Sequence, residues 1–308
     1  WCADFVRDLE EIETRLARLR FRGVKGATGT QDSFLKLFAG DQRKVQRLEQ
    51  RVARAFGFAA VEPVTGQTYS RKVDAQVAAA LAGIAAGVHK FANDVRLLAN
   101  LKEVEEPFER TQVGSSAMAY KRNPMRCERA TGLARYVLSA CGSAFQTAAE
   151  QWLERTLDDS AAKRIVMPEL FLATDGMLRL VTNVARGLVV YPKVIRRHVD
   201  AELPFMATEE IIMEAVAAGG DRQELHEAIR VHAQAAAARV KREGRENNLL
   251  DLLADDERFA SINVKKVLDP KRYVGRAVEQ VEAFNKVYVV PLRRRFRKVL
   301  DADATLEV

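Results

Sequence analysis

The sequence has 308 residues, 48% of them hydrophobic, so it is long enough to bury a sizeable core or two smaller ones. Its 49 Lys and Arg against 42 Asp and Glu give a net charge of +7, which favours anionic partners but does not separate nucleic acid from a phosphorylated or dicarboxylate metabolite. Cys2, Cys127 and Cys141 lack the paired spacing of zinc ligands and are too few for a disulfide framework, which excludes a disulfide-stapled secreted domain and indicates the reducing cytoplasm.

The first predicted helix begins at the first residues of the chain. Phe5, Leu9, Ile12 and Leu16 recur at helical spacing, and the numbering opens on Trp1 without a methionine. We therefore expect a fragment or a processed product whose amino-terminal part is missing. The opening residues carry acidic side chains where a signal peptide needs a basic flank, and no apolar run approaches the roughly 20 residues that span a bilayer. A soluble protein that does not bind membranes is expected.

The strongest periodic pattern lies in the first half of the chain. Apolar residues recur there at steps of three and four and predict one long helix: Val73, Val77, Leu81, Ile84, Val88, Phe91, Val95 and Leu98. Similar stripes begin at Val45, Leu133 and Leu172. Because each stripe must be buried against another long helix, the pattern predicts an all-α fold with an extended helix bundle.

Residues 111–129, TQVGSSAMAYKRNPMRCER, interrupt the helical pattern. Gly114 frees the backbone and Pro124 precludes a continuous helix, so a polar loop over residues 111–126 is predicted to lead into the next helix. The side chains in this loop that could carry chemistry are Ser115, Ser116, Lys121 and Arg122. A solvated connection would have the same composition, so these residue types alone leave both interpretations open.

A domain boundary is predicted near residue 190. The long stripes end at 187–192, GLVVYP, and shorter helical segments follow, punctuated by prolines and glycines. We expect a central long-helix bundle over residues 1–189 and a smaller helical carboxy-terminal domain over residues 190–308. Residues 287–290, VYVV, are ambiguous between strand and helix and are assigned to a helix end.

The loop carries the most specific motif of the chain. GSSAMAYKRNP is similar to the GSSxMPxKxNP signature of the fumarase/aspartase superfamily, and its continuation, MRCERATGLARYV, resembles the adenylosuccinate lyase family. Five further segments resemble that family: residues 21–34, 65–74, 94–109, 151–164 and 202–213. The resemblance covers nearly the whole chain. It implies a long-helix bundle, a homotetramer whose active sites are shared between subunits, and no cofactor.

The resemblance implies an anti elimination in purine nucleotide biosynthesis. Fumarate would leave adenylosuccinate to give AMP, and would leave the imidazole-carboxamide substrate SAICAR to give AICAR. By position in the signature, Ser115 is the base, Lys121 holds the succinyl carboxylate, and Glu128 orients a catalytic histidine. That histidine, the general acid, belongs to a THxQ-type segment that would precede Trp1. A polypeptide confined to these residues is therefore expected to be nearly inactive.

The resemblance also assigns substrate-binding positions: Gln67, Ser116, Asn123, Arg129, Arg155, Ser160 and Arg164. Cationic side chains together with a hydroxyl suit phosphate and carboxylate groups. The alternatives are a helix-capping turn around Gln67 and structural ion pairs of Arg155 and Arg164 with Asp158 and Asp159. The loop departs from the signature at Ala119, where the family has proline, and this substitution loosens its backbone.

Other classes of function fit the sequence less well. The four histidines, His89, His198, His226 and His232, lack the spacing of metal ligands, so no metal site is expected. The alternatives are another lyase of the superfamily or a non-catalytic relative. A nucleic-acid-binding fragment could use the basic residues at 293–298, but the run lacks interleaved aromatics for base stacking, so a solvated face of a terminal helix is the commoner explanation. The expected partners are succinylated purine nucleotides and not nucleic acid.

Overall fold

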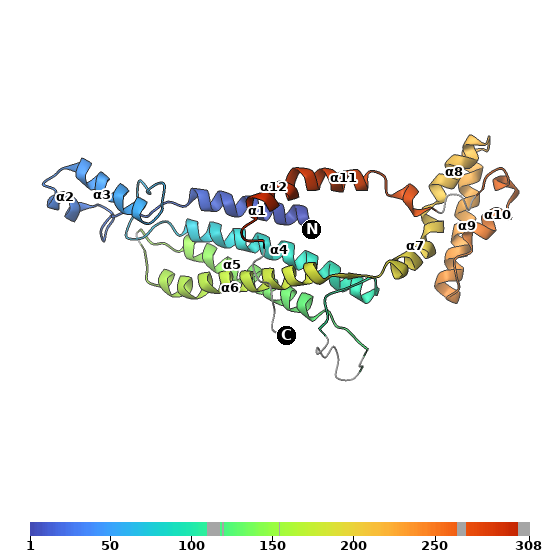
Figure 1. Ribbon diagram of the computed structural model, residues 1–308, viewed down its shortest axis with the longest axis horizontal. Coiled ribbons are helices and arrows are strands. Elements are labelled where there is room, and N and C mark those ends of the chain that lie inside the picture. Colours follow the sequence, from blue (N-terminus) through green and yellow to red (C-terminus); the bar gives the residue numbers. More distant parts are fainter. Residues whose placement is uncertain (110–117, 119, 154, 264–268, 301–308) are drawn as a thin grey trace. The chain divides into compact units, whose positions relative to one another are not determined.

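The computed structural model describes residues 1–109, 118, 120–153, 155–263 and 269–300, and the described part is almost entirely helical (Figure 1). The all-α prediction is therefore confirmed. The chain divides into two compact units between Val189 and Val190. The first unit contains α1 (Cys2–Arg18), α2 (Asp32–Leu37), α3 (Gln42–Ala55), α4 (Lys72–Asn100), β1 (Val104–Glu105), α5 (Met125–Ala149) and α6 (Asp158–Gly187).

The first unit is built around α4, α5 and α6. These helices lie side by side and alternate in direction, and α1 packs against α4 (Figure 1). The predicted apolar stripe of α4 supplies much of the core, because Leu81, Ile84, Val88, Phe91 and Val95 are all buried. They pack against one buried face of α5 and one of α6, represented by Val137, Leu170, Met177 and Val184. Burying each such side chain contributes about 1.5–3 kcal/mol, which holds the bundle together.

One feature of α6 does not follow from the sequence pattern. Pro168 lies inside this long helix, where its ring lacks the N–H that would bond to the carbonyl of Arg164. Helix α6 nevertheless runs from Asp158 to Gly187. Gly187 at its end is required for close packing, because a Cβ there would lie 2.6 Å from the side chain of Pro107. At this end β1 pairs with β2 (Val189–Val190).

The second unit has its own small core. It contains α7 (Pro192–Met206), α8 (Thr208–Ala217), α9 (Arg222–Glu243), α10 (Leu249–Ala254), η1 (Glu257–Phe259), η3 (Pro270–Tyr273), α11 (Ala277–Phe284), the π-helical turn η4 (Asn285–Val289) and α12 (Val290–Arg295). Asp221 caps the start of α9, because its side chain accepts hydrogen bonds from the N–H groups of Gln223 and Glu224. The core joins α8, α9 and α10 through Ile211, Leu225, Ile229, Leu249 and Leu253.

The segment VYVV is helical, as predicted. It lies in η4 and the first residue of α12, within a helical stretch that continues from α11 rather than at a helix end. The basic residues that follow, Arg293, Arg294 and Arg295, are exposed on α12 and its end. Their exposure agrees with a solvated face.

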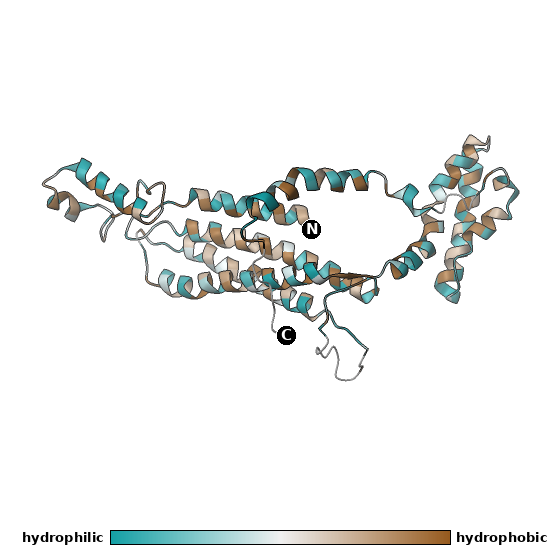
Figure 2. Cartoon of the chain, in the orientation of Figure 1, coloured by the Kyte–Doolittle hydropathy of each residue, from teal (hydrophilic) through white to brown (hydrophobic). Residues whose placement is uncertain are grey.

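Helix α4 is long and apolar enough to cross a bilayer by length and composition. We expected no segment apolar enough to span a bilayer. That expectation holds for uninterrupted apolar runs but not for the average composition of α4. Core helices of bundles satisfy the same two criteria, and 50% of the most apolar stretch of α4 is buried inside this bundle. Figure 2 shows hydrophobic residues running along α4, α5 and α6, in contrast to the mostly hydrophilic α3.

Candidate active site

The described candidate residues fall into two groups at opposite ends of α5. Lys121, Asn123, Glu128 and Arg129 lie at its beginning, which we call the signature end. Gln67, Arg155, Ser160 and Arg164 lie near its other end, which we call the GQT end after residues 66–68. The rise along α5 from Glu128 to Ala149 is about 30 Å at roughly 1.5 Å per residue. Ser115 and Ser116 lie outside the described residues.

The signature end is fixed by a carboxylate that caps α5. As predicted, the helix begins directly after Pro124. The side chain of Glu106 accepts hydrogen bonds from the backbone N–H groups of Arg126 at 2.9 Å and Cys127 at 3.0 Å. These are two of the N–H groups that the first turn of a helix leaves without partners, and a negative charge is favourable at that end. Glu106 therefore sets where α5 starts.

Arg126 is the largest fully buried side chain of the protein's described part, with 2% of its surface exposed. Its guanidinium donates hydrogen bonds to the carbonyl oxygen of Pro107 and to Glu109 Oε1, the latter at 2.9 Å. This side chain ties the start of α5 back to the segment that follows β1. Arg126 is thus a structural cation, whereas its neighbour Arg129 is exposed.

Most candidate residues of the signature end are exposed to solvent. Lys121, Glu128 and Arg129 are exposed and Asn123 is half-buried. Arg122 contacts Glu105 at 3.3 Å and lies over the ring of Phe108. The arrangement offers cations and an amide at one surface, which suits a carboxylate that develops negative charge. The length of α5 separates these side chains from those of the GQT end.

The GQT end contains a cavity of about 830 Å³. One wall is the segment 64–72, which includes Gln67, and the other wall is the end of α5 with Gln151 and Leu153 just beyond it. The segment 64–72 is held in place by the loop that precedes α2. The guanidinium of Arg22 donates to the carbonyls of Gly26 at 2.9 Å and Gly66 at 2.8 Å.

The contact between these two loops requires glycine at position 29. Gly29 has a φ of +84°, and a Cβ there would lie 2.0 Å from the carbonyl oxygen of Thr65. Two segments that resemble the lyase family, residues 21–34 and 65–74, are therefore in contact. The loop around Gln67 is therefore held against the loop that contains Gly29.

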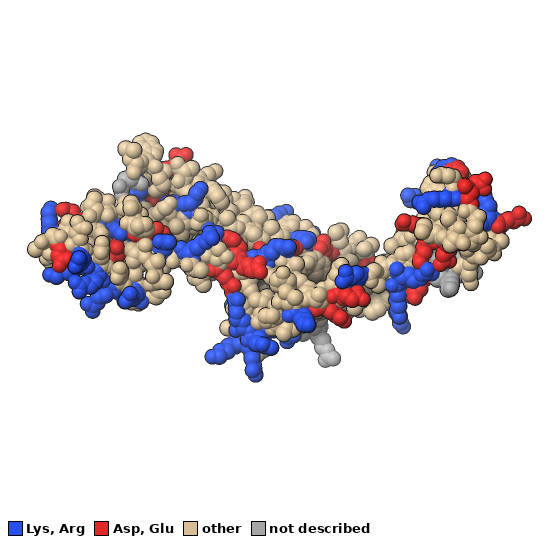
Figure 3. Space-filling view, turned by 90° about the horizontal axis from the view of Figure 1, so that it is seen from above, with Lys and Arg blue, Asp and Glu red and all other residues tan. Residues whose placement is uncertain are grey.

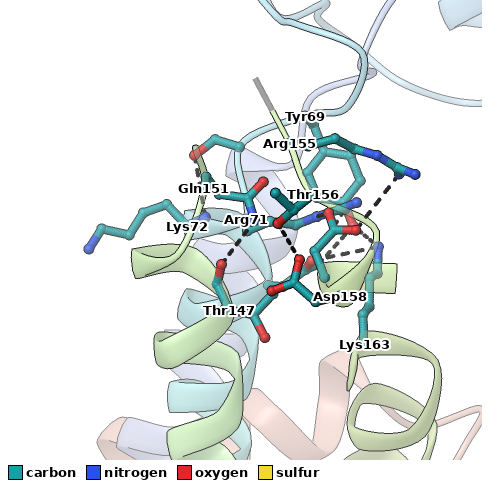
Figure 4. A network of polar contacts seen from close by, with 12 residues as sticks. Tyr69, Arg71, Lys72, Thr147, Gln151, Arg155, Thr156, Asp158 and Lys163 are labelled. Atoms are coloured by element: carbon teal, nitrogen blue, oxygen red, sulfur yellow. Dashed lines mark hydrogen bonds and ion pairs between the residues drawn. The ribbon is translucent and has the colours of Figure 1, made fainter. Parts of the chain in front are cut away.

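A network of polar and charged side chains adjoins the cavity, and two of its members, Tyr69 and Arg71, also line the cavity (Figure 4). Arg71 Nε donates to Asp159 Oδ2 at 2.7 Å, and Arg71 also lies 3.6 Å from Asp74. Tyr69 donates to Asp74 at 2.7 Å, and Lys163 approaches both Asp74 and the Tyr69 hydroxyl. Burial raises the pKa of Tyr69 above its ordinary value, so the hydroxyl stays neutral.

The network connects α4 to the start of α6, and this is where three candidate residues lie. Arg155 Nη1 is 3.8 Å from Asp159 Oδ1, so the structural ion pair considered as an alternative for Arg155 is present. Arg155 still exposes 20% of its side chain, while Arg164 is exposed and Ser160 is half-buried in the first turn of α6. Binding and ion pairing are therefore compatible for Arg155, because one guanidinium has five donors.

Positive charge is concentrated at this end of the first unit. Helix α3 exposes Arg43, Arg47, Arg51 and Arg54, which recur at steps of four and three and so share one face. Figure 3 shows Lys and Arg side chains gathered over the segment that contains α2 and α3. A surface of this kind raises the local concentration of anionic ligands.

The histidines contribute no metal centre among the described residues, where no cluster of three or more His, Cys, Asp or Glu side chains could hold an ion. His89 contacts the amide of Asn93 at 3.0 Å within α4. His232 contacts Asp256 at 2.7 Å in the second unit. Both serve as links within their own unit.

Comparisons with known proteins agree with this architecture. Residues 1–139 match the family described as Lyase, and residues 204–284 match the family described as Adenylosuccinate lyase C-terminus. The chain is 54% identical to the adenylosuccinate lyase of Saccharomyces cerevisiae over 98% of its own length and 63% of that protein. It is 48% identical to the adenylosuccinate lyase of Schistosoma mansoni, over 100% of its own length and 65% of that protein.

A solved structure supports the fold. The crystal structure of fumarate lyase from Mesorhizobium sp. BNC1 matches with a TM-score of 0.73 at 22% identity, covering 92% of this chain and 61% of that one. Bundle and signature together define a lyase of the fumarase/aspartase class. Within that class, the chain belongs to the adenylosuccinate lyase family. It spans less than two thirds of the length of these relatives.

Proposed function

We propose that copies of this chain contribute the signature end and the GQT end to the active sites of an adenylosuccinate lyase of the cytoplasm. The enzyme eliminates fumarate from adenylosuccinate, giving AMP, and from SAICAR, giving AICAR. Family membership supports this activity. The structural observation that carries the proposal is the placement of two complementary groups of side chains, one suited to a reacting carboxylate and one to a nucleotide, at the two ends of α5.

The signature end supplies the chemistry of the reaction. Ser115 removes the proton from the succinyl carbon, and the carbanion is stabilised by the adjacent carboxylate, which Lys121 and Asn123 hold. A serine hydroxyl is a weak base until it loses its own proton, so the positive charge of Lys121 also favours the alkoxide. The C–N bond then breaks. The leaving nitrogen takes a proton from a histidine that Glu128 orients and that is none of the four in this chain.

The GQT end binds the nucleotide. Gln67 faces the cavity of about 830 Å³, and Arg155, Ser160 and Arg164 supply cations and a hydroxyl nearby. Guanidinium groups and hydroxyls are suitable donors to phosphate. Ser116 and Arg129 complete the substrate contacts from the signature end. The reaction needs no cofactor, because the carboxylate that stabilises the carbanion belongs to the substrate.

The two ends meet between copies of the chain. A nucleotide-sized substrate is much shorter than the roughly 30 Å from Glu128 to Ala149, so one copy cannot supply both groups to one site. In a homotetramer with antiparallel bundles, the signature end of one subunit lies beside the GQT end of another. Large apolar side chains exposed on α5 and α6 provide the surface for such packing: Tyr136, Leu138, Phe145, Phe171 and Leu172.

A panel of substrates tests the proposed function. The purified enzyme, carrying this chain together with the proposed histidine, is incubated separately with adenylosuccinate, SAICAR, argininosuccinate and malate, and fumarate is followed by ultraviolet absorbance. We expect fumarate from the first two only. Release from argininosuccinate or malate would assign the chain to another lyase of the superfamily, and no release from any substrate would favour a non-catalytic relative.

A further inference from the structure

A single buried carboxylate lies between two arginines at the GQT end. Asp159 has no exposed side-chain surface, and its Oδ2 atom accepts from Arg71 Nε at 2.7 Å. Its other oxygen, Oδ1, makes no hydrogen bond within the described residues and lies 3.8 Å from Arg155 Nη1. A shift of Arg155 by about 1 Å would turn this ion pair into a charge-assisted hydrogen bond.

The two arginines differ in what else they can reach. Arg71 exposes only 6% of its side chain and is held by Asp159 and Asp74 in the interior. Arg155 exposes 20% and precedes the first turn of α6, where Ser160 and Arg164 also lie. Asp159 can therefore anchor one edge of the Arg155 guanidinium while its other donors remain available to a ligand. Arg71, in turn, fixes the carboxylate of Asp159.

We propose that Asp159 is a positioning residue, which orients Arg155 toward the phosphate of the substrate without touching the substrate itself, while Arg71 fixes the carboxylate of Asp159. This inference rests on the proposed function, since it assigns Arg155 to the nucleotide phosphate. It adds a reason for the buried charges, because they hold the guanidinium of a partly exposed arginine in one arrangement.

Asp74 offers a matched control for Asp159. It is a nearly buried aspartate in the same network, lies 3.6 Å from both Arg71 and Lys163, and accepts from Tyr69. No contact between Asp74 and Arg155 is present among the described residues. If the loss of a buried charge only loosened the structure, the two substitutions would have similar effects on KM. If Asp159 positions Arg155, only the effect of its substitution should depend on Arg155.

The experiment is a double-mutant cycle on the purified enzyme. Asp159→Asn keeps the shape and removes the charge, and we expect the KM for adenylosuccinate to rise about tenfold while kcat changes less than about threefold. In an Arg155→Gln background, Asp159→Asn should change KM by less than about twofold, because the side chain it positions is already gone. Asp74→Asn should change KM equally in both backgrounds. Should Asp159→Asn fail to fold, Asp159→Glu serves in the same cycle with a smaller expected effect.

Succinyladenosine, which lacks the phosphate, separates this inference from its alternatives. With this substrate the wild type and Asp159→Asn should have the same KM. Equal KM increases for both substrates, an undiminished effect in the Arg155→Gln background, or an Asp74→Asn variant that shows the same coupling to Arg155 would each overturn the positioning role. A wild-type protein that releases no fumarate would instead overturn the proposed function.

Discussion

Glu106 and Cys127 are joined by a hydrogen bond of 3.0 Å from the backbone N–H of Cys127 to the Glu106 carboxylate, at the first turn of α5. The same carboxylate accepts from the N–H of Arg126 at 2.9 Å. This contact decides where the long helix begins, and the candidate residues Lys121 and Asn123 immediately precede that point. The helix start and the proposed carboxylate-holding residues are thus positioned by one buried acid.

Replacing Glu106 with Ala should lower the free energy of unfolding by about 2–4 kcal/mol, because two charge-assisted hydrogen bonds are lost and two buried N–H groups are left without an acceptor. Activity should fall as well, since the start of α5 is no longer fixed. Urea unfolding and fumarate release measure the two effects. Glu105→Gln is the control, because the ion pair of Glu105 with Arg122 is partly exposed and should contribute at most about 1 kcal/mol. Equal losses in both variants would contradict the capping role.

The three cysteines should differ sharply in reactivity. Cys2 is exposed, whereas Cys127 and Cys141 are buried. Burial raises the pKa of both buried thiols, and the nearby Glu106 raises that of Cys127 further. Titration with Ellman's reagent near pH 8 should therefore detect one fast thiol per native chain and three in urea. Fast reaction of a second thiol in the native protein would show that the α5 face of the bundle is open.

Asp256 links α9 to the end of α10, because it accepts hydrogen bonds from Arg258 and contacts His232 at 2.7 Å. The Arg258 guanidinium, with a smaller contribution from His232, holds the pKa of Asp256 well below its ordinary value. A lowered pKa in the folded state means that this stabilisation is complete above about pH 4 and is lost as the pH falls toward the folded-state pKa.

Asp256→Asn should therefore speed hydrogen exchange of residues 249–259 at pH 6, and the difference from wild type should shrink as the pH is lowered below about 4. The expected local destabilisation at pH 6 is about 1–2 kcal/mol. Asp255→Asn, an exposed neighbour, should leave exchange unchanged. A difference that persists undiminished at pH 3 would mean that the Asp256 charge is not what stabilises this region.

Ser115 should be the base of the elimination. Ser115→Ala should lower kcat by roughly a thousandfold or more, because the proton is no longer removed while most binding contacts remain. Ser116→Ala should be much milder and should act mainly on KM. Steady-state kinetics with adenylosuccinate measure both. The reverse order of the two effects would move the base to Ser116.

The fold could be predicted where it depends on local periodicity. The stripe from Val73 to Leu98 predicts α4, which the structure extends from Lys72 to Asn100, and Pro124 predicts the start of α5. The continuous helix through Pro168 could not be predicted. A proline usually ends or bends a helix, and the packing of α6 against α5 that compensates for it comes from distant residues.

The candidate site could be predicted only in part from the sequence. Motif residues such as Lys121 and Gln67 stand out by resemblance, but the sequence does not reveal that they lie at opposite ends of a helix. The ion pair of Arg71 with Asp159 joins residues 88 positions apart. Nothing in the local pattern around either residue indicates its partner. The role of Glu106 could not be predicted either, because its sequence context is that of an ordinary surface acid and only the structure shows that it is buried.

Each active site is proposed to combine the signature end of one copy with the GQT end of another. Lys121→Ala and Arg164→Ala variants, each nearly inactive alone, should therefore complement one another when they are mixed, dissociated and reassembled. Every site takes its two groups from two different copies. When the variants are mixed in equal amounts and assemble at random, each group is intact in about half of the sites, so both groups are intact in about a quarter of them. Fumarate release from adenylosuccinate by the mixture should rise to about a quarter of the wild-type rate. A mixture no more active than the sum of the two separate variants would contradict the shared site.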